Sequence, residues 1–175
     1  MNNTMTMENS DLAFANVGLP QEYREQIIPL LNTLLSDEHL LYIKTRNYHW
    51  NLTGPEFYSL HQLFEEQYNE LQGIGDIVAE HARMLGGYAL GTMTEFLEQS
   101  RLQELPGETP SARTMVATLL DDHGTIMNAL REDIDTIQEE YNDESTADML
   151  IATLRAHEKM AWMLRSLLSG TSVRS

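Results

Sequence analysis

The sequence predicts an all-α fold, a four-helix bundle in which one long connection includes a short extra helix. Three observations predict it. Apolar residues recur at helical spacing in four long stretches, no stretch alternates apolar and polar residues as a strand does, and only one of the three connections is long. A chain of 175 residues suits one domain. We expect this domain to span residues 20–170, with a flexible tail at 1–19 and a short tail at 171–175.

The first two helices are expected to form a hairpin. Apolar residues recur at helical spacing between Pro20 and His49, and Pro20 suits the first helical turn. Pro29 lies inside this stretch, so a late start or a kink is expected there. The segment NLTGP at 51–55 is typical of a turn, and a second long helix is predicted from about Phe57 to Leu85.

The long connection follows the second helix. Glycines at 86, 87 and 91 open it, and prolines at 106 and 110 close it. Between them, residues from Thr94 to Arg101 are predicted to form the short extra helix.

The last two helices are expected to form a second hairpin. Ser111 can cap the third helix, which should end near Tyr141. Ser145 or Thr146 can cap the fourth helix, and Gly170 can stop it. Four helices with one long crossover connection are typical of ferritin-like bundles.

Charge is the most unusual feature of the composition. The formal net charge is −16, and the chain has no cysteine. This charge repels nucleic acid and anionic membranes and attracts cations. The lack of cysteine excludes disulfides, thiolate zinc sites and iron–sulfur clusters. No apolar run approaches the roughly 20 residues of a membrane span, and no secretory signal is visible, so we expect a cytoplasmic protein without a membrane partner.

Four candidate metal ligands lie on the predicted second helix. At 100° per residue, His61, Glu65, Asp76 and Glu80 all fall within an arc of about 100°. However, the eleven residues from Glu65 to Asp76 span roughly 16 Å, whereas ligand atoms sit about 2 Å from a metal ion. One helix therefore cannot bring both pairs to the same metal.

A two-fold axis solves this problem. If the second helix pairs antiparallel with its copy near residues 70 and 71, His61 and Glu65 face Asp76 and Glu80 of the partner subunit. His49, at the end of the first helix, can add a third ligand from the first subunit. Two imidazoles and three carboxylates suit Fe(II), Mn(II) or Zn(II).

Two glycines favour this pairing. Gly73 and Gly75 would lie beside the axis, and close approach of two backbones would explain their presence inside a helix. The alternative interpretation is that these carboxylates and histidines only form a solvated acidic face.

Several motifs together closely resemble the Dps family of mini-ferritins. The resemblance covers about residues 30–168. It rests on HWN-x-x-G-x-x-F-x-x-x-H at 49–61, D-x-x-A-E at 76–80, LGG-x-ALGT at 85–92, D-x-S-T-A-D-M at 143–149 and W-M-L-x-S at 162–166.

The resemblance implies a hollow homo-dodecamer with ferroxidase sites at its two-fold interfaces. Family members oxidise Fe(II), often with hydrogen peroxide and otherwise with dioxygen, and store the ferric product as a mineral. By position, His49, His61 and Glu65 would come from one subunit, and Asp76 and Glu80 from its partner. Such sites would hold two irons, and zinc can occupy the same donor set.

Two positions depart from the family pattern. Glu65 stands where Asp is usual, and His81 stands where Arg is usual. His81 is either an additional or outer-shell metal ligand, or a solvated or hydrogen-bonded side chain. Trp50, beside His49, resembles a family tryptophan near the site that is suggested to intercept stray oxidising equivalents, and simple packing is the alternative.

Acidic residues gather at the start of the predicted fourth helix. Asp143, Glu144 and Asp148 fall in a segment similar to the one that lines a three-fold iron-entry pore in the family. Three copies would attract Fe²⁺. His123 and His157 fall on apolar helix stripes, and we expect both to be hydrogen-bonded in the core. The role of His39 is not determined by its pattern.

Three other functions are alternatives to a ferroxidase. A nucleoid DNA-binding protein is disfavoured, because no basic residue precedes Arg24 and the last five residues include only Arg174. A zinc-occupied shell with weak ferroxidase activity stays open. A larger ferritin or bacterioferritin is excluded, because no Glu has a His three residues later.

Overall fold

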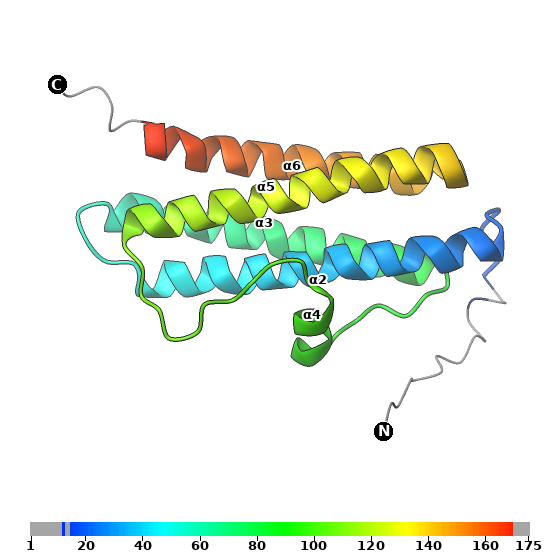
Figure 1. Cartoon of the computed structure of the whole chain (residues 1–175), viewed down its shortest axis with the longest axis horizontal. Helices are drawn as coiled ribbons and strands as arrows, with labels where there is room; N and C mark the ends of the chain where they lie inside the picture. The colour runs from blue at the N-terminus through cyan, green and yellow to red at the C-terminus, as the bar shows by residue number, and fades with distance from the viewer. Residues whose placement is uncertain (1–11, 13–14, 170–175) are drawn as a thin grey trace.

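The computed structural model describes residue 12 and residues 15–169 of the chain. Within them the fold is all-helical, so the predicted four-helix bundle with a short extra helix is confirmed (Figure 1). Most of the expected N-terminal tail, the tail at 171–175 and the predicted stop at Gly170 lie outside the described residues. The elements are α2 (Gln21–Asn51), α3 (Phe57–Met84), α4 (Met93–Gln99), α5 (Ala112–Thr136), a π-helix η1 (Ile137–Tyr141) and α6 (Glu144–Ser169).

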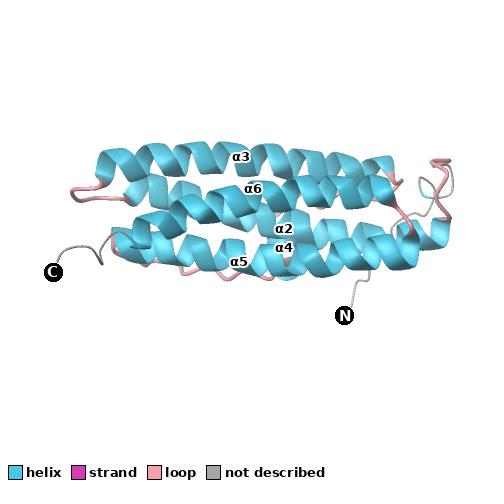
Figure 2. Ribbon diagram, turned by 90° about the horizontal axis from the view of Figure 1, so that it is seen from above, coloured by secondary structure: helices cyan, strands magenta, loops and turns pink. Residues whose placement is uncertain are grey.

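The bundle consists of two helical hairpins. α2 packs mainly on α3, and α5 packs mainly on α6, so that the four long helices lie side by side (Figure 2). Phe64, Leu41, Leu119 and Leu130 are among the fully buried side chains at the centre. Burying each such side chain stabilises the fold by about 1.5–3 kcal/mol. No helix among the described residues is long and apolar enough to cross a membrane.

The expected late start of the first helix is wrong. α2 begins at Gln21, directly after Pro20, and continues through Pro29. Pro29 and Glu25 are both exposed. The backbone carbonyl of Glu25, which loses its helical N–H donor to the proline, therefore lies on the side of the helix that water can reach.

Polar side chains of α2 fasten the long connection. The Asn32 amide donates to the Tyr88 carbonyl (2.9 Å) and accepts from the Leu90 N–H (3.0 Å). One turn further, the buried Asp37 carboxylate accepts from the Arg101 backbone N–H (2.7 Å) and from its Nε (2.6 Å). Asn32 and Asp37 thus bind the connection to the bundle at two points. Their polar side chains are not part of the apolar pattern of the helix.

The predicted caps of the fourth helix are wrong. α6 begins at Glu144, and Asp143 is the capping residue. The Asp143 carboxylate accepts from the backbone N–H of Thr146 (3.2 Å) and also from its hydroxyl. The preceding helix does end at Tyr141 as predicted, but its last five residues form a π-helix, and Asn142 follows in the left-handed conformation (φ 51°).

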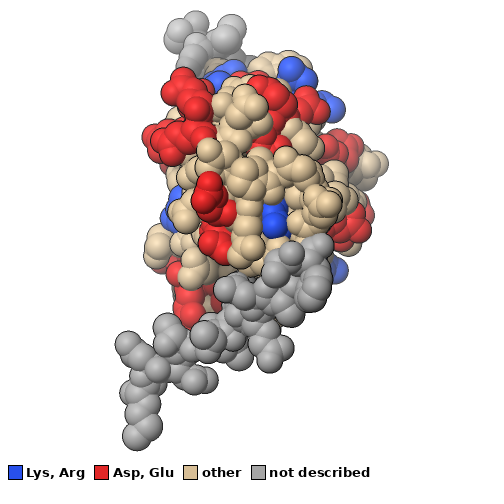
Figure 3. Space-filling model, turned by 90° about the vertical axis from the view of Figure 1, so that its right-hand side faces the viewer, with Lys and Arg blue, Asp and Glu red and all other residues tan. Residues whose placement is uncertain are grey.

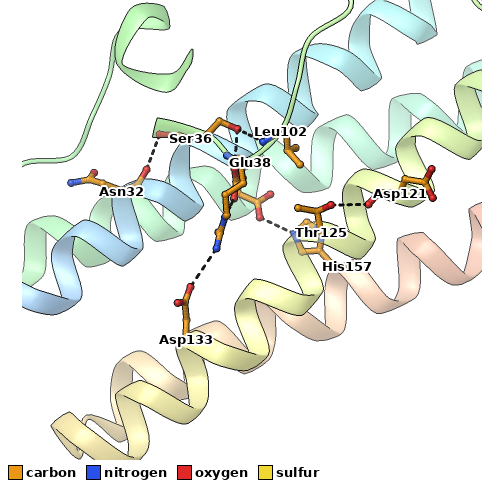
Figure 4. A network of polar contacts seen from close by, with 11 residues as sticks. Asn32, Ser36, Glu38, Leu102, Asp121, Thr125, Asp133 and His157 are labelled. Atoms are coloured by element: carbon orange, nitrogen blue, oxygen red, sulfur yellow. Dashed lines mark hydrogen bonds and ion pairs between the residues drawn. The ribbon is translucent and has the colours of Figure 1, made fainter. Parts of the chain in front are cut away.

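The two predicted core histidines are confirmed as hydrogen-bonded. His123 of α5 and His157 of α6 are both fully buried, with their Nδ1 atoms 2.8 Å apart. Nε2 of His157 lies 2.7 Å from Oε1 of Glu38 on α2, a contact drawn in Figure 4.

Candidate metal centre

The imidazoles of His49 and His61 lie face to face where α2 ends and α3 begins. Their ring centroids are 3.7 Å apart and their planes differ by 15°. Nδ1 of His49 donates to the backbone carbonyl of His61 (2.8 Å), and Nδ1 of His61 donates to that of His49 (2.9 Å). The His49 carbonyl belongs to the last turn of α2, where helical partners are missing, so the second bond also satisfies the helix end.

These two bonds determine which ring nitrogens are free. Because a carbonyl oxygen can only accept, both Nδ1 atoms must be protonated, and both neutral rings therefore present Nε2 as a lone pair. Neither Nε2 has a hydrogen-bond partner among the described residues. Phe57 stacks on His61 (4.9 Å), and the Tyr68 ring packs nearly perpendicular to His49 (5.2 Å). These contacts hold both imidazoles in place. An Nδ1–H bonded to a carbonyl is the usual arrangement of a metal-binding histidine.

Glu65 lies one helical turn beyond His61 and is exposed. Its Oε1 accepts a long hydrogen bond from the Tyr68 hydroxyl (3.4 Å). Asp76 and Glu80 are also exposed, further along the same helix, and neither makes a hydrogen bond or ion pair with the described part of the chain. Three carboxylates on α3 are thus available to a ligand from outside.

A single subunit does not bring these groups together. α3 is continuous from Phe57 to Met84, so Glu65 and Asp76 stay roughly 16 Å apart along its axis. Across residue 12 and residues 15–169, no three His, Asp or Glu side chains are placed to hold one metal ion. Metal binding by this ligand set would therefore require a second subunit.

The explanation expected for Gly75 is wrong. A Cβ atom at Gly75 would lie 3.3 Å from the His39 ring, so α2 of the same chain accounts for this glycine. His39 itself stacks on Phe96 (4.2 Å), and its Nδ1 donates to the Leu35 carbonyl (2.9 Å). Gly73 has open space around it, and an approaching partner helix is still a prediction there.

His81 contacts the start of α6. Its Nε2 lies 2.8 Å from the Thr146 hydroxyl oxygen, whose own hydrogen is directed at Asp143, so Nε2 is the donor. Burial lowers the pKa of His81, against a smaller raising effect of Asp143. The structure thus gives His81 a specific hydrogen-bond partner, Thr146, which favours a hydrogen-bonded side chain over a metal ligand.

The other two candidate pore residues, Glu144 and Asp148, are exposed. α6 starts at the end of the bundle that Figure 3 views, where acidic side chains are spread over the surface among fewer basic ones.

Trp50 is 62% exposed, so packing inside its own subunit does not explain it. The guanidinium of Arg46 lies over its ring (5.0 Å) and also over those of Tyr42 (5.6 Å) and Tyr68 (5.7 Å). Sequence reasoning missed Arg46 and Tyr68. The spacing of Tyr42, Arg46 and Trp50 in steps of four along one helix was the signal that could have found the first of them.

Comparisons with known proteins agree with this fold. The ferritin-like domain family matches residues 28–172. An uncharacterized low temperature-induced protein of Nostoc is 46% identical, over 90% of this chain and 88% of its own. DNA protection during starvation protein 2 of Bacillus anthracis is 38% identical, over 83% of this chain and 98% of its own.

One solved structure links the fold to iron chemistry. A Dps protein from Vibrio cholerae O1, described as a member of a broad superfamily of ferritin-like diiron-carboxylate proteins, superposes with a TM-score of 0.83. It is 29% identical and covers 88% of this chain and 96% of that one. The fold is thus that of a ferritin-like protein. Within that class, the chain belongs to the Dps family.

Proposed function

We propose that this protein is a ferroxidase and iron store, in which Fe(II) is oxidised between two subunits and the ferric product is kept inside a dodecameric shell. His49, His61 and Glu65 of one subunit would bind the iron together with the partner subunit's Asp76 and the partner subunit's Glu80. The observation that supports this most is the reciprocal bonding of His49 and His61, which leaves both Nε2 lone pairs free.

The donor set fits iron as the substrate. Imidazole and carboxylate without sulfur suit Fe(II), and carboxylates become better ligands for the harder Fe(III) ion. Glu65, Asp76 and Glu80 have no strong partner among the described residues to compete with a metal. The diiron-carboxylate description of the Vibrio cholerae relative is consistent with this choice of metal.

Exposed apolar side chains support a partner at this face. Ile77 is 54% exposed and Met84 is 60% exposed, and at 100° per residue both fall within about 60° of Glu80 on α3. Large exposed apolar groups beside the candidate ligands are typical of an interface. We infer that this side of α3 packs on its copy.

The proposed reaction takes one electron from each of two Fe(II) ions. Hydrogen peroxide accepts both electrons and two protons, and it leaves as two water molecules. Transfer of both electrons at one site avoids the hydroxyl radical that a single-electron step would release. The protein's part is to hold both irons with groups that stay oriented throughout, which the carbonyl bonds to Nδ1 achieve.

Iron is proposed to enter at the start of α6. Glu144 and Asp148 are exposed there, whereas the Asp143 carboxylate caps the helix. Three copies of this end around an axis would form a negative opening that concentrates Fe²⁺.

Direct DNA binding is not part of the proposal. The first basic residue, Arg24, is only 3% exposed. Its guanidinium donates to the carbonyls of Leu12, Leu19 and Leu85, so it is not available to phosphates. We propose that any protection of DNA comes from removal of iron and peroxide.

Anaerobic stopped-flow mixing of Fe(II)-loaded protein with hydrogen peroxide tests the proposal. We expect fast oxidation in the wild type and at least a tenfold slower rate in His49→Ala and Asp76→Ala. His39→Ala, a half-buried histidine outside the proposed ligand set, serves as the matched control and should oxidise Fe(II) as the wild type does. Equal rates in all four proteins would refute the ferroxidase assignment.

A further inference from the structure

Three ionisable side chains form a chain across the bundle core, away from the candidate metal centre. They are Glu38 on α2, His157 on α6 and His123 on α5, and each is 0% exposed. Oε1 of Glu38 lies 2.7 Å from Nε2 of His157, and Nδ1 of His157 lies 2.8 Å from Nδ1 of His123. Figure 4 shows Glu38 and His157 directed at each other from opposite helices. The chain thus joins three of the four long helices.

The contact between the two rings limits how many protons they can hold. A hydrogen bond between two Nδ1 atoms needs a hydrogen on one of them and a lone pair on the other. The two rings together can therefore carry two or three protons while the contact lasts. A fourth proton would put a hydrogen on both Nδ1 atoms and force them apart.

Both ends of this chain are unsatisfied. Oε2 of Glu38 and Nε2 of His123 are buried and have no hydrogen-bond partner in the described structure. A proton added to His123 would therefore find no acceptor at Nε2. Buried polar atoms without partners are rare, and they raise the free energy of the folded state.

The surrounding charges cannot compensate a further positive charge. On α2, Asp37 pairs with Arg101 (2.6 Å) and Lys44 pairs with Asp122 of α5 (2.6 Å). Asp133 of α5 lies 3.9 Å from the same Arg101, and His39 of α2 stacks on Phe96.

The other long helices offer no buried counter-charge. The buried residues of α3 include no ionisable side chain, and those of α5 and α6 include only His123 and His157. Among the described residues, Glu38 is thus the one nearby carboxylate that pairs with one of the two buried histidines.

We propose that Glu38, His157 and His123 form an acid-sensitive latch, which holds α2, α5 and α6 together and opens when the two histidine rings take up a fourth proton. The proposal goes beyond the ferroxidase function, since none of the three residues belongs to the candidate metal centre. Its consequence is that the centre of each subunit loosens in acid while the ends of the helices are unaffected.

The direction of the pH effect follows from linkage. Burial first, and the neighbouring His157 second, lower the pKa of His123 well below its usual value. The opened state, in which a histidine titrates near its usual 6.5, therefore binds more protons than the closed state below that pH. The latch contributes its full stability above about pH 6.5. Below it, the opened rings hold four protons and the closed rings three, so the closed state loses about a factor of ten per pH unit.

Hydrogen–deuterium exchange of the full-length, metal-free protein between pH 7.5 and 5 tests this. After correction for intrinsic exchange rates, protection of residues 119–127 and 153–161 should fall about tenfold per pH unit below about pH 6.5 in the wild type. His123→Asn keeps an amide at the position of Nδ1 but cannot take up the proton, so its protection should fall much less. His39→Asn, the matched control, should behave as the wild type. Equal slopes in His123→Asn and the wild type would overturn the latch.

A measurement on the wild type covers the case in which His123→Asn does not fold. Nitrogen-15 NMR of histidine-labelled, sedimented protein should detect a coupling between two Nδ1 atoms at pH 7.5, and this coupling should vanish in acid. No such coupling at pH 7.5, or its persistence after both rings are charged, would contradict the proposal.

Discussion

His49 and His61 each donate Nδ1–H to the backbone carbonyl oxygen of the other, over 2.8 and 2.9 Å. The pair does two things at once. It closes the turn between α2 and α3, and it turns both Nε2 lone pairs away from the backbone. A substitution that keeps a donor at the position of Nδ1 but removes Nε2 can therefore separate the effect on folding from the effect on metal binding.

His61→Asn is expected to keep the fold and lose the activity. The Asn amide can still donate to the His49 carbonyl, but it has no group at the position of Nε2. We expect thermal unfolding close to that of the wild type, and Fe(II) oxidation slowed at least tenfold. His61→Ala should lose the activity and also about 1 kcal/mol of stability, because the His49 carbonyl loses its donor. Unchanged oxidation in His61→Asn would exclude His61 as a ligand.

Mixed shells test whether the site is shared between subunits. In a pair made of one His61→Ala subunit and one Asp76→Ala subunit, one of the two sites has all its ligands and the other lacks two. Co-refolding the two inactive variants in equal amounts should thus restore about a quarter of the sites, because half of the two-fold pairs are mixed. Oxidation rate per subunit measures this. If the mixture stays as inactive as its components, the ligands do not come from two subunits.

Gly87 is expected to resist substitution. A Cβ atom there would lie 2.6 Å from the Ile28 side chain, which is packed in the core. Gly87→Ala should destabilise the protein by about 1–3 kcal/mol, as overpacking does. Gly91→Ala is the matched control, since no atom lies within 4 Å of its Cβ position. Denaturant unfolding compares the two, and equal midpoints would show that Ile28 moves aside freely.

Asp143 is expected to stabilise the folded protein because it caps α6. Asp143→Ala removes the acceptor of the Thr146 N–H and should cost about 1 kcal/mol. Asp143→Asn keeps a capping oxygen and should cost less, because Asn is also a good N-cap residue. Thermal unfolding distinguishes the two variants. A loss of the same size in both would mean that the charge of Asp143, and not its cap, matters.

Glu144 and Asp148 are expected to act mainly in iron entry. Both are exposed and neither caps α6, so Glu144→Gln with Asp148→Asn should lower the thermal unfolding midpoint only slightly, through the lost charge of Glu144 in the first turn of α6. The rate of iron uptake at low ionic strength should fall several-fold, and added salt should reduce the difference from the wild type. A rate equal to that of the wild type at all salt concentrations would remove these residues from the entry route.

Periodicity predicted the architecture well, because α3, α5 and α6 each bury one apolar stripe. Helix ends were harder. Asp143, Ser145 and Thr146 are all good capping residues within four positions, and local sequence does not choose among them. Asp143 caps the helix while the Thr146 hydroxyl also accepts from His81, which lies sixty-five residues earlier in the chain.

For the candidate site, too, local spacing indicated which residues share a helix face but not the contacts between helices. The arc shared by His61, Glu65, Asp76 and Glu80 follows from helical geometry alone. The mutual hydrogen bonds of His49 and His61 depend on how α3 folds back on α2, which no spacing reveals. Gly75 shows the opposite error, since its neighbour is His39 of its own chain and the pattern suggested a partner subunit.

Anomalous scattering at the iron edge, from crystals soaked anaerobically with Fe(II), tests the interface site most directly. We predict a peak bound by Nε2 of His49, Nε2 of His61 and the Glu65 carboxylate, with the partner subunit's Asp76 and the partner subunit's Glu80 completing the set. Iron bound elsewhere, with no peak between α3 and its copy, would contradict the proposed function.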